Sequence, residues 1–373
     1  MQGERTSLRE LAGLFTKLGL TAFGGPAAHI AMMQKEVVDK RQWMDHQHFL
    51  DLIGATNLIP GPNSTEMAIH IGHERGGWKG LLVAGCCFIL PAVLITGVIA
   101  WLYQRYGQLP QVRPFIYGIK PAIIAIILAA VFPLGKKALK SLELWVIGAL
   151  TLVASLAGVN EIIVMFGAGL VMLLLYLVRR TGGTAKGFFP LLLFNVPFFS
   201  ADNVRIFLVF LKIGAILYGS GYVLFAFLDS ELVARGLLSR TQLVDAIAVG
   251  QFTPGPVFSS VTFIGWQMNG LPGAVMATVA VFLPSFVFVA LLNPLVPRMR
   301  RSKLFSAFLD GVNAASVAII VTVCIAFARE TVTDWRTVLI AVLSLAVTFG
   351  FRKVNTVFVV IGSALAGYVL QAL

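Results

Sequence analysis

Charged residues are scarce in this sequence, and long stretches contain none. Only 12% of the 373 residues are charged and 58% are hydrophobic, whereas a soluble domain carries about 25% charged residues. Residues 81–103, 246–297 and 354–373 have no charge at all, and each stretch reaches the length of about 20 residues that crosses a bilayer as a helix. A soluble globular protein is therefore excluded. Because the alternation typical of a membrane barrel is also missing, we predict an all-α polytopic membrane protein.

Cysteines and catalytic motifs are equally sparse. Cys86, Cys87 and Cys324 lie inside apolar runs without CxxC spacing, which excludes a disulfide framework or a redox motif. The sequence has no nucleotide-binding loop, nucleophile elbow or pair of catalytic carboxylates. We therefore expect neither an enzyme nor an ATP-driven pump, and no cofactor. A cleavable signal peptide is not expected either, because Gly24-Gly25-Pro26 interrupts the first apolar run.

Positive charge exceeds negative charge, with a formal net charge of +12. The basic residues form short clusters between apolar runs, as in loops that obey the positive-inside rule. We therefore expect no nucleic-acid partner, and a multi-pass protein of the cell (inner) membrane surrounded by lipid. A homodimer is compatible with these features.

A weak internal repeat organises the chain. Its matching positions share an offset of 193 to 195 residues: Lys17 with Lys212, Glu36 with Glu231, Asp51 with Asp245, Pro60-Gly61-Pro62 with Pro254-Gly255-Pro256, and Pro91 with Pro284. A nearly constant offset over about a hundred residues indicates duplication. We predict an N-terminal repeat over 1–185, a linker over 186–203 and a C-terminal repeat over 204–373.

Loop charges predict that the two repeats are inverted in the membrane. The cluster Lys136, Lys137 and Lys140 follows the apolar segment 114–134, whereas the cluster 298–303 precedes the equivalent segment of the second half. Both clusters should be cytoplasmic. We expect about ten crossings with both termini outside, in which either the first segment or the Pro-Gly-Pro segment of each half is re-entrant. Two broken spanning helices per half is the alternative.

The two Pro-Gly-Pro breaks are the predicted substrate site. Proline interrupts a helix, and a helix that restarts after the break directs free amides and the positive end of its dipole at the gap. Polar residues next to both breaks can donate hydrogen bonds to an oxyanion. The predicted substrate-binding residues here are Asn57, Pro60, Gly61, Pro62, Asn63, Ser64, Thr65, Gln251, Pro254, Gly255, Pro256 and Ser259. A purely structural proline kink is the alternative.

Three lysines are further candidates for substrate binding. Lys17 and Lys212 occupy equivalent positions in the two halves, and Lys120 has Asn313 as its counterpart. A lysine at membrane depth is costly enough to indicate function, although snorkelling to the interface is the alternative.

Glu66, one turn beyond the first break, is the candidate proton carrier, with Glu36 and Glu231 as weaker candidates. Its structural alternative is a carboxylate that stabilises a helix N-terminus. The i, i+3 spacing of His70, His73 and Glu74 is too weak a pattern to predict a metal site.

With these motifs in place, the chain resembles the long form of the chromate ion transporter family. The resemblance rests on segments that follow one another along almost the whole chain. In the first half they are Phe23-Gly24-Gly25-Pro26, Met33–Trp43 with Glu36 and Arg41, Leu58–Glu66 and Phe88-Ile89-Leu90-Pro91, and in the second half Tyr218-Gly219-Ser220-Gly221, Gln251–Phe258 and Phe308–Ala315. The resemblance implies secondary active export of chromate from the cytoplasm, with sulfate as the natural isostere, driven by a proton or anion gradient. A transporter of the same architecture for sulfate uptake, an organic anion or a divalent cation is the alternative, and a membrane scaffold or sensor is a third reading.

Overall fold

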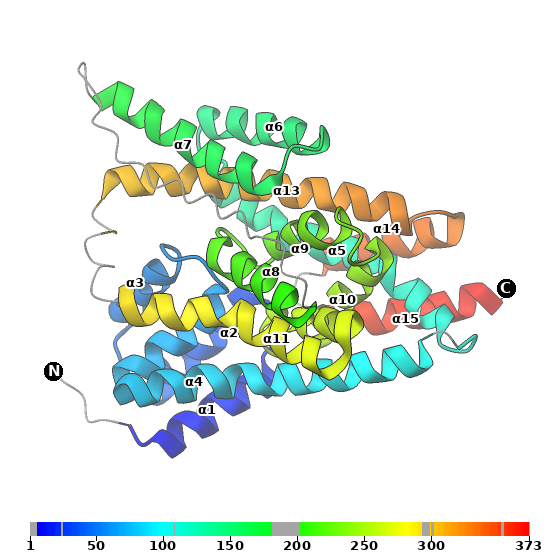
Figure 1. The fold of residues 1–373 in the computed structure, drawn as a ribbon, viewed down its shortest axis with the longest axis horizontal. Helices are drawn as coiled ribbons and strands as arrows, with labels where there is room; N and C mark the ends of the chain where they lie inside the picture. Colours follow the sequence, from blue (N-terminus) through cyan, green and yellow to red (C-terminus); the bar gives the residue numbers. More distant parts are fainter. Residues whose placement is uncertain are drawn as a thin grey trace.

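The computed structural model describes residues 6–23, 25–107, 109–180, 202–292, 299, 302–351 and 354–372 (Figure 1). Every regular element in these residues is a helix, which confirms the all-α prediction. The predicted linker, apart from its last two residues, lies outside the described residues, as do Arg298, Arg300 and Arg301 of the second basic cluster.

The same succession of helices occurs twice. The first half contains α1 (Leu8–Thr21), α2 (Pro26–Gln34), the π-helix η1 (Lys35–Lys40), α3 (His46–Thr56), α4 (Asn63–Tyr106), α5 (Arg113–Ala138), α6 (Leu142–Leu156) and α7 (Glu161–Arg180). The second half contains α8 (Asp202–Ile216), α9 (Val223–Leu228), the π-helix η2 (Asp229–Val233), α10 (Arg240–Phe252), the 3-10 helix η3 (Val257–Ser259), α11 (Ser260–Leu292), α13 (Lys303–Thr331), α14 (Trp335–Gly350) and α15 (Thr356–Ala372). The predicted repeat is confirmed, and even the π-helical turn after the second helix is duplicated.

Helix α4 is a hairpin of two arms, 63–76 and 77–106. At Gly77 the backbone has φ +59°, a conformation that interrupts a helix. Gly72 packs directly against the backbone of Gly80, although residues eight apart in a continuous helix are separated by about 12 Å. The chain therefore reverses at Gly77. Helix α11 reverses in the same way at Gly270, with φ +57°.

The Pro-Gly-Pro segment of the first half is re-entrant. His48, at the start of α3, lies 2.8 Å from the Glu74 carboxylate near the end of the first arm of α4. The two helices are therefore antiparallel, and Pro60–Pro62 form the turn between them at the far end. A re-entrant Pro-Gly-Pro segment is one of the possibilities that the sequence left open.

The segment α1–η1 also folds back instead of crossing. Arg41, just after η1, lies 3.7 Å from Glu10 in the first turn of α1, so the chain returns to the level at which it entered. With 14 residues, α1 is about 21 Å long, short of the roughly 30 Å hydrocarbon core. Each half therefore contributes two short hairpins and four helices along the long axis of the bundle, where one net crossing was expected from the broken region.

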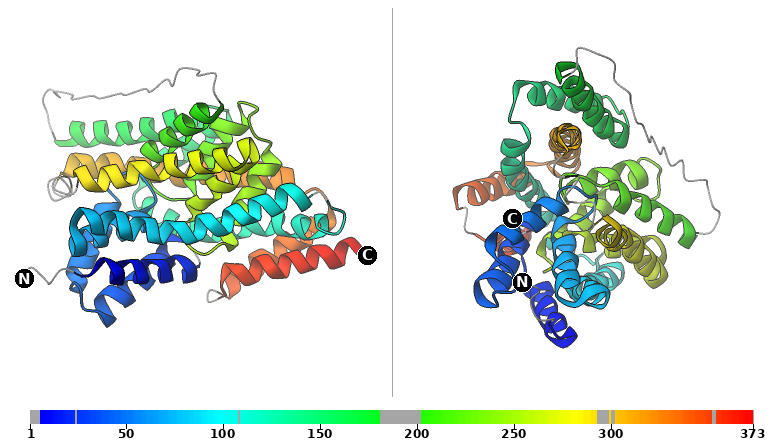
Figure 2. Two further views of the ribbon diagram at one scale, coloured as in Figure 1. Left: turned by 60° about the horizontal axis from the view of Figure 1, so that its bottom comes forward. Right: turned by 90° about the vertical axis from the view of Figure 1, so that its left-hand side faces the viewer.

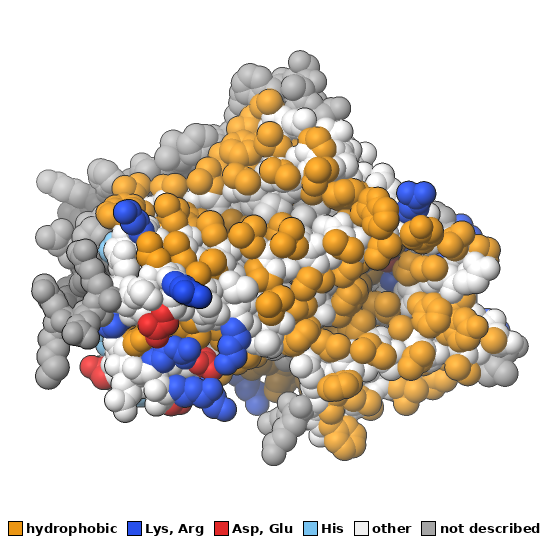
Figure 3. Space-filling model, turned by 90° about the horizontal axis from the view of Figure 1, so that it is seen from below, with side chains coloured by type: hydrophobic (Ala, Val, Ile, Leu, Met, Phe, Trp, Pro, Cys, Tyr) orange, Lys and Arg blue, Asp and Glu red, His pale blue; other side chains and the backbone are white. Residues whose placement is uncertain are grey.

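Five helices are long and apolar enough to cross a membrane: α4, α5, the described part of α7 over 161–179, the stretch 257–291 and α13. The shorter apolar helices α6, α14 and α15 run alongside them. Exposed leucines and valines face outward on α6, as expected where side chains meet lipid. In Figure 3 hydrophobic side chains cover most of the face, whereas charged side chains gather at the end where α1 begins.

The two halves enter the bundle from opposite ends, as predicted. Trp266, near the tip of the α11 hairpin, donates to Gln104 at the end of α4 farthest from Gly77. Thr6 bonds to the carbonyl of Arg75 at one end, and α15 finishes at the other (Figures 1 and 2). The described chain ends thus lie at opposite ends of the bundle, and not both on the outer side as expected.

The Gly72–Gly80 contact gives a test of the hairpin. We expect Gly72→Val to destabilise the protein by about 1–3 kcal/mol, because its Cβ would overlap the backbone of Gly80. The measurement is the melting temperature in detergent. Gly167→Ala is the matched control, since a Cβ there meets no atom within 4 Å; equal melting temperatures for both variants would contradict the hairpin contact.

Candidate functional site

The two Pro-Gly-Pro turns are each bonded to the opposite half of the chain. The amide of Gly61 donates to the carbonyl of Leu217, and the amide of Gly255 donates to the carbonyl of Ala22, both at 2.8 Å. Donors and acceptors are repeat equivalents, so the two bonds form a reciprocal pair. Both glycines have positive φ, +141° and +91°, which other residues rarely adopt.

The turns lie about halfway along the bundle. Gly19, near the end of α1, packs against Phe88 and Pro91, which lie midway along the second arm of α4. Ala22 directly follows α1, and its carbonyl accepts the hydrogen bond from the Gly255 amide. The turns therefore reach the middle of the bundle from opposite ends.

A helix N-terminus without a side-chain cap follows each turn. Pro62 is the N-cap of α4 and Pro256 that of η3, and neither has a side-chain cap hydrogen bond. The first amides of such a helix, here those of Asn63 and Ser64, have no intrahelical acceptor. Free amides at a helix start favour an anion.

Buried polar atoms without a hydrogen-bond partner cluster near both turns. In the described residues they include the hydroxyls of Thr65 and Ser260, whereas the buried Glu66 carboxylate and the Ser285 hydroxyl bond to each other. Such atoms are rare in folded proteins because leaving them unpaired is costly. Their concentration here fits a site whose partners are a ligand, protons or water.

Other polar residues at the turns make local bonds. Asn63 donates to the side chain of Asn57 at 2.7 Å, and the Ser64 hydroxyl lies 3.3 Å from Nδ1 of His29. At the second turn, Thr96 of α4 donates to the Ser259 hydroxyl at 3.3 Å. His29, Thr96 and Ser285 were not predicted from the sequence; of these, only Ser285 carries a usable signal, because it directly follows the repeated proline at 284.

Lys17 and Lys212 form equivalent ion pairs in the two halves. Lys17 pairs with Glu36 at 3.3 Å and Lys212 with Glu231 at 2.7 Å, each joining the first helix of its half to the following π-helix. Hydrogen bonds from Lys40 above all, and from Arg41 and Lys17, lower the pKa of Glu36 from 4.5 to about 2. Any contact of these two lysines with substrate stays a prediction.

Lys120 joins the two halves. Its ammonium lies 3.1 Å from Asp245 of α10, which also accepts a 2.5 Å hydrogen bond from Tyr103 of α4. Asp245 is buried, with 4% of its side chain exposed.

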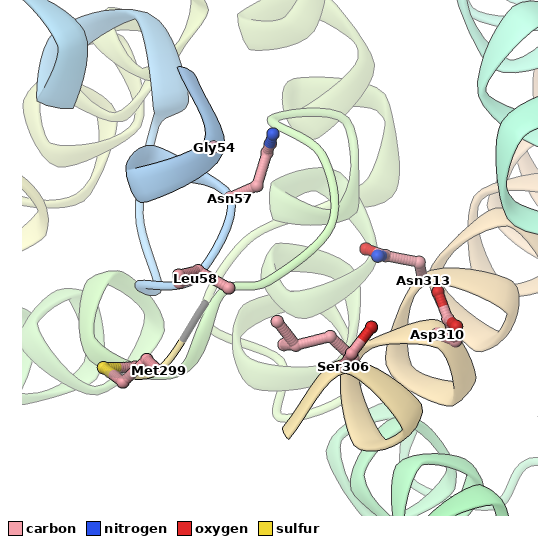
Figure 4. Close-up of a pocket in the computed structure, with 8 residues that line it drawn as sticks. Gly54, Asn57, Leu58, Met299, Ser306, Asp310 and Asn313 are labelled. Carbon is pink, nitrogen blue, oxygen red and sulfur yellow. The ribbon is translucent and has the colours of Figure 1, made fainter. Parts of the chain in front are cut away.

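A cavity of about 250 Å³ lies between the end of α3 and the start of α13 (Figure 4). It is lined by Gly54, Asn57, Leu58, Met299, Ser306, Leu309, Asp310 and Asn313. Asn57 connects the cavity to the first turn through Asn63, and Asn313, the counterpart of Lys120, faces it from α13. At its rim Lys140 pairs with Asp310 at 2.8 Å.

The histidines are dispersed. Glu74 bonds to His48, and the ring of His73 meets Trp78 edge-on. Within the described residues, no group of three or more His, Cys, Asp or Glu side chains is arranged to hold a metal.

The ion cluster at Glu36 predicts a pH dependence. A lowered pKa in the folded state means that ionised Glu36 stabilises the fold above pH 4.5 and that this stabilisation disappears as the pH falls towards 2. We expect Glu36→Gln to melt lower than the parent at pH 7 and the difference to shrink between pH 5 and pH 2. The measurement is the melting temperature of the parent and of Glu36→Gln at several pH values across this range. The exposed neighbour Asp39→Asn is the control; a constant difference for Glu36→Gln would contradict the expectation.

Comparison with known proteins yields a consistent set of relatives. The sequence profile described as "Chromate transporter" matches residues 9–173 and again 204–368. The chain is 31% identical to the chromate transport protein of Cupriavidus metallidurans over 98% of this chain and 94% of that protein. It is 30% identical to the chromate transport protein of Pseudomonas aeruginosa (98% and 92%) and 29% identical to the probable chromate transport protein of Synechococcus elongatus (97% and 95%). No solved structure matches.

Proposed function

Because the chain belongs to the chromate transporter family, we propose that it is a secondary transporter of the cell membrane that exports chromate from the cytoplasm. The observation that carries the proposal is the pair of Pro-Gly-Pro turns, docked reciprocally in the middle of the bundle, each followed by an uncapped helix start. Relatives named as chromate transport proteins support the choice of substrate.

The substrate is held between these helix starts. A tetrahedral dianion accepts several hydrogen bonds, and the free amides of Asn63 and Ser64 with the hydroxyls of Thr65 and Ser260 supply donors without a fixed positive charge. Because these donors carry no full positive charge, they bind the dianion without holding it so tightly that it cannot be released. Sulfate has the same shape and charge and competes for the site.

Alternating access follows from the inverted repeat. In transporters of this kind, the two repeats exchange conformations and expose a midplane site first to one side and then to the other. The cavity beside Asn57 is the present route to the site. It opens at the end that carries Lys136, Lys137 and Lys140, which the positive-inside rule assigns to the cytoplasm.

Glu66 couples transport to protons. Its carboxylate is fully buried, and Ser285 and Gly61 lie beside it. A buried carboxylate without a cation is costly when it is ionised, and its negative charge would repel a dianion one turn from the helix start. A proton on Glu66 therefore accompanies substrate binding, and loss of that proton promotes release. The exported pair of dianion and proton carries one net negative charge, so the interior-negative membrane potential favours its exit.

Thr65 tests the substrate site. In proteoliposomes with an imposed proton gradient, we expect the parent to transport chromate and Thr65→Val to raise the KM for chromate at least tenfold, because a buried donor is lost at unchanged volume. Thr151→Val, at a buried hydroxyl on α6, is the control with parental KM. The absence of chromate or sulfate flux in the parent under any proton or anion gradient would refute the proposed function.

Glu66 tests the coupling. Glu66→Gln mimics the protonated acid, so we expect chromate exchange to persist while uphill transport driven by a proton gradient falls at least tenfold. The measurement compares counterflow with gradient-driven uptake in the same vesicles. Gradient-driven uptake equal to that of the parent would assign coupling to another group.

A further inference from the structure

The two halves of the chain are equivalent in sequence but differ in how their re-entrant hairpins are packed. Helix α10 packs against α5, α13 and α15, and Phe252 at its end joins an apolar cluster with Ile126 and Val359. The equivalent of Phe252 is Leu58, which lines the cavity between α3 and α13. One side of the molecule is therefore closed where its repeat equivalent is open.

Burial of equivalent residues shows the same asymmetry. Gln251 is 5% exposed, whereas its counterpart Asn57 is exposed and borders the cavity. Ala248, also 5% exposed, corresponds to the cavity residue Gly54. Because alternating access in inverted repeats exchanges the two packings, the closed side shows where the second cavity would form.

The closed side carries an ion pair that the open side cannot reproduce. Lys120 of the first half pairs with Asp245 of the second, and Tyr103 holds the other oxygen of that carboxylate. The counterpart of Lys120 is Asn313, a neutral amide, and it lines the open cavity. The Lys120–Asp245 ion pair therefore has no charged equivalent at Asn313, although Lys140 and Asp310 pair at the rim of the cavity.

We propose that Tyr103, Asp245 and Lys120 form a latch that keeps closed the pathway at the end of the bundle opposite the cavity. Asp245 and Tyr103 are positioning residues, which hold Lys120 against α10. When the latch opens, Lys120 comes to line the second cavity with its ammonium group. Its position there is equivalent to the one that Asn313 now has at the first cavity. There it binds a tetrahedral oxyanion dianion, whose charge replaces that of Asp245.

Burial gives the latch its strength and its sensitivity to substrate. An ion pair removed from water is destabilised strongly when one partner is lost, because the other charge stays buried and unpaired. A dianion that enters from the cavity competes with Asp245 for Lys120, and this competition links substrate binding to opening. The inference rests on the alternating-access part of the proposed function.

Cysteine accessibility tests the latch without substrate. In a background lacking Cys86, Cys87 and Cys324, Ser306→Cys reports on the open cavity and Ala248→Cys on the closed side. We expect a hydrophilic maleimide to label Ser306→Cys rapidly and Ala248→Cys at least tenfold more slowly in purified protein. Adding Lys120→Gln or Asp245→Asn should raise the labelling rate of Ala248→Cys at least tenfold, and the charge-swapped pair Lys120→Asp with Asp245→Lys should restore protection.

Two further variants keep the test decisive. Tyr103→Phe removes a single hydrogen bond, so a folded protein with a two- to fivefold faster Ala248→Cys reaction is expected even if the charge variants fail to fold. Arg179→Gln, which breaks an ion pair of α7 with Glu143, should leave the rate unchanged. Unchanged rates in folded Lys120→Gln, Asp245→Asn and Tyr103→Phe would overturn the latch.

The labelling result separates this inference from the proposed function. Faster labelling of the latch variants in a protein that moves no chromate or sulfate would refute the transport proposal and leave the latch standing. Chromate transport together with unchanged labelling would refute the latch alone.

Discussion

The reciprocal hydrogen bonds from Gly61 to Leu217 and from Gly255 to Ala22 are the constraint on which the structure depends. Backbone that leaves helical geometry at membrane depth finds no water there, so protein must satisfy it. Each half of the chain breaks its helices twice at that depth, once after α1 and once at Pro-Gly-Pro. The break after α1 leaves a backbone carbonyl without a partner in its own half, and the Pro-Gly-Pro turn leaves a backbone amide without one. The amide of each half donates to the carbonyl of the other half. The short hairpins can reach the middle of the bundle only because of this exchange.

Symmetry in the backbone coexists with asymmetry in the chemistry. Glu66 follows the first turn at a position where the second half has Ser260, and Lys120 stands where the second half has Asn313. The ion pairs Lys17–Glu36 and Lys212–Glu231, in contrast, are duplicated and brace the same pair of elements in each half. Duplicated contacts thus stabilise the repeat, whereas the unequal positions lie next to the turns, the cavity and the inter-repeat contact.

Much of this architecture could be predicted from the sequence, because repeat offset and loop charge are both one-dimensional signals. They predicted the two halves, their inversion and the broken segments at Pro60–Pro62 and Pro254–Pro256. A re-entrant first segment was one of the alternatives, but the sequence did not predict that both broken segments of a half fold back, since the apolar run around α1 is long enough to cross a bilayer. Recognising that α1 spans just 14 residues requires knowing where the helix ends.

The features of the site that the sequence did not predict depend on partners far apart in the chain. Lys120 meets Asp245 across more than a hundred residues, and no pattern in the sequence pairs them. Lys17 and Glu36, however, recur at the same offset as Lys212 and Glu231, so their pairing was accessible to a closer reading of the repeat. The unpaired hydroxyls of Thr65 and Ser260 depend on burial in three dimensions, which composition alone does not reveal.

The exchange of backbone bonds also sets an order for biogenesis. When the ribosome has completed only the first half, the amide of Gly61 and the carbonyl of Ala22 are already committed to the membrane interior, but their partners Leu217 and Gly255 have not been made. The two groups can therefore be paired in this way only after the second half has been made. Final burial of all four broken segments becomes a single late event, which occurs once residue 255 has left the translocon.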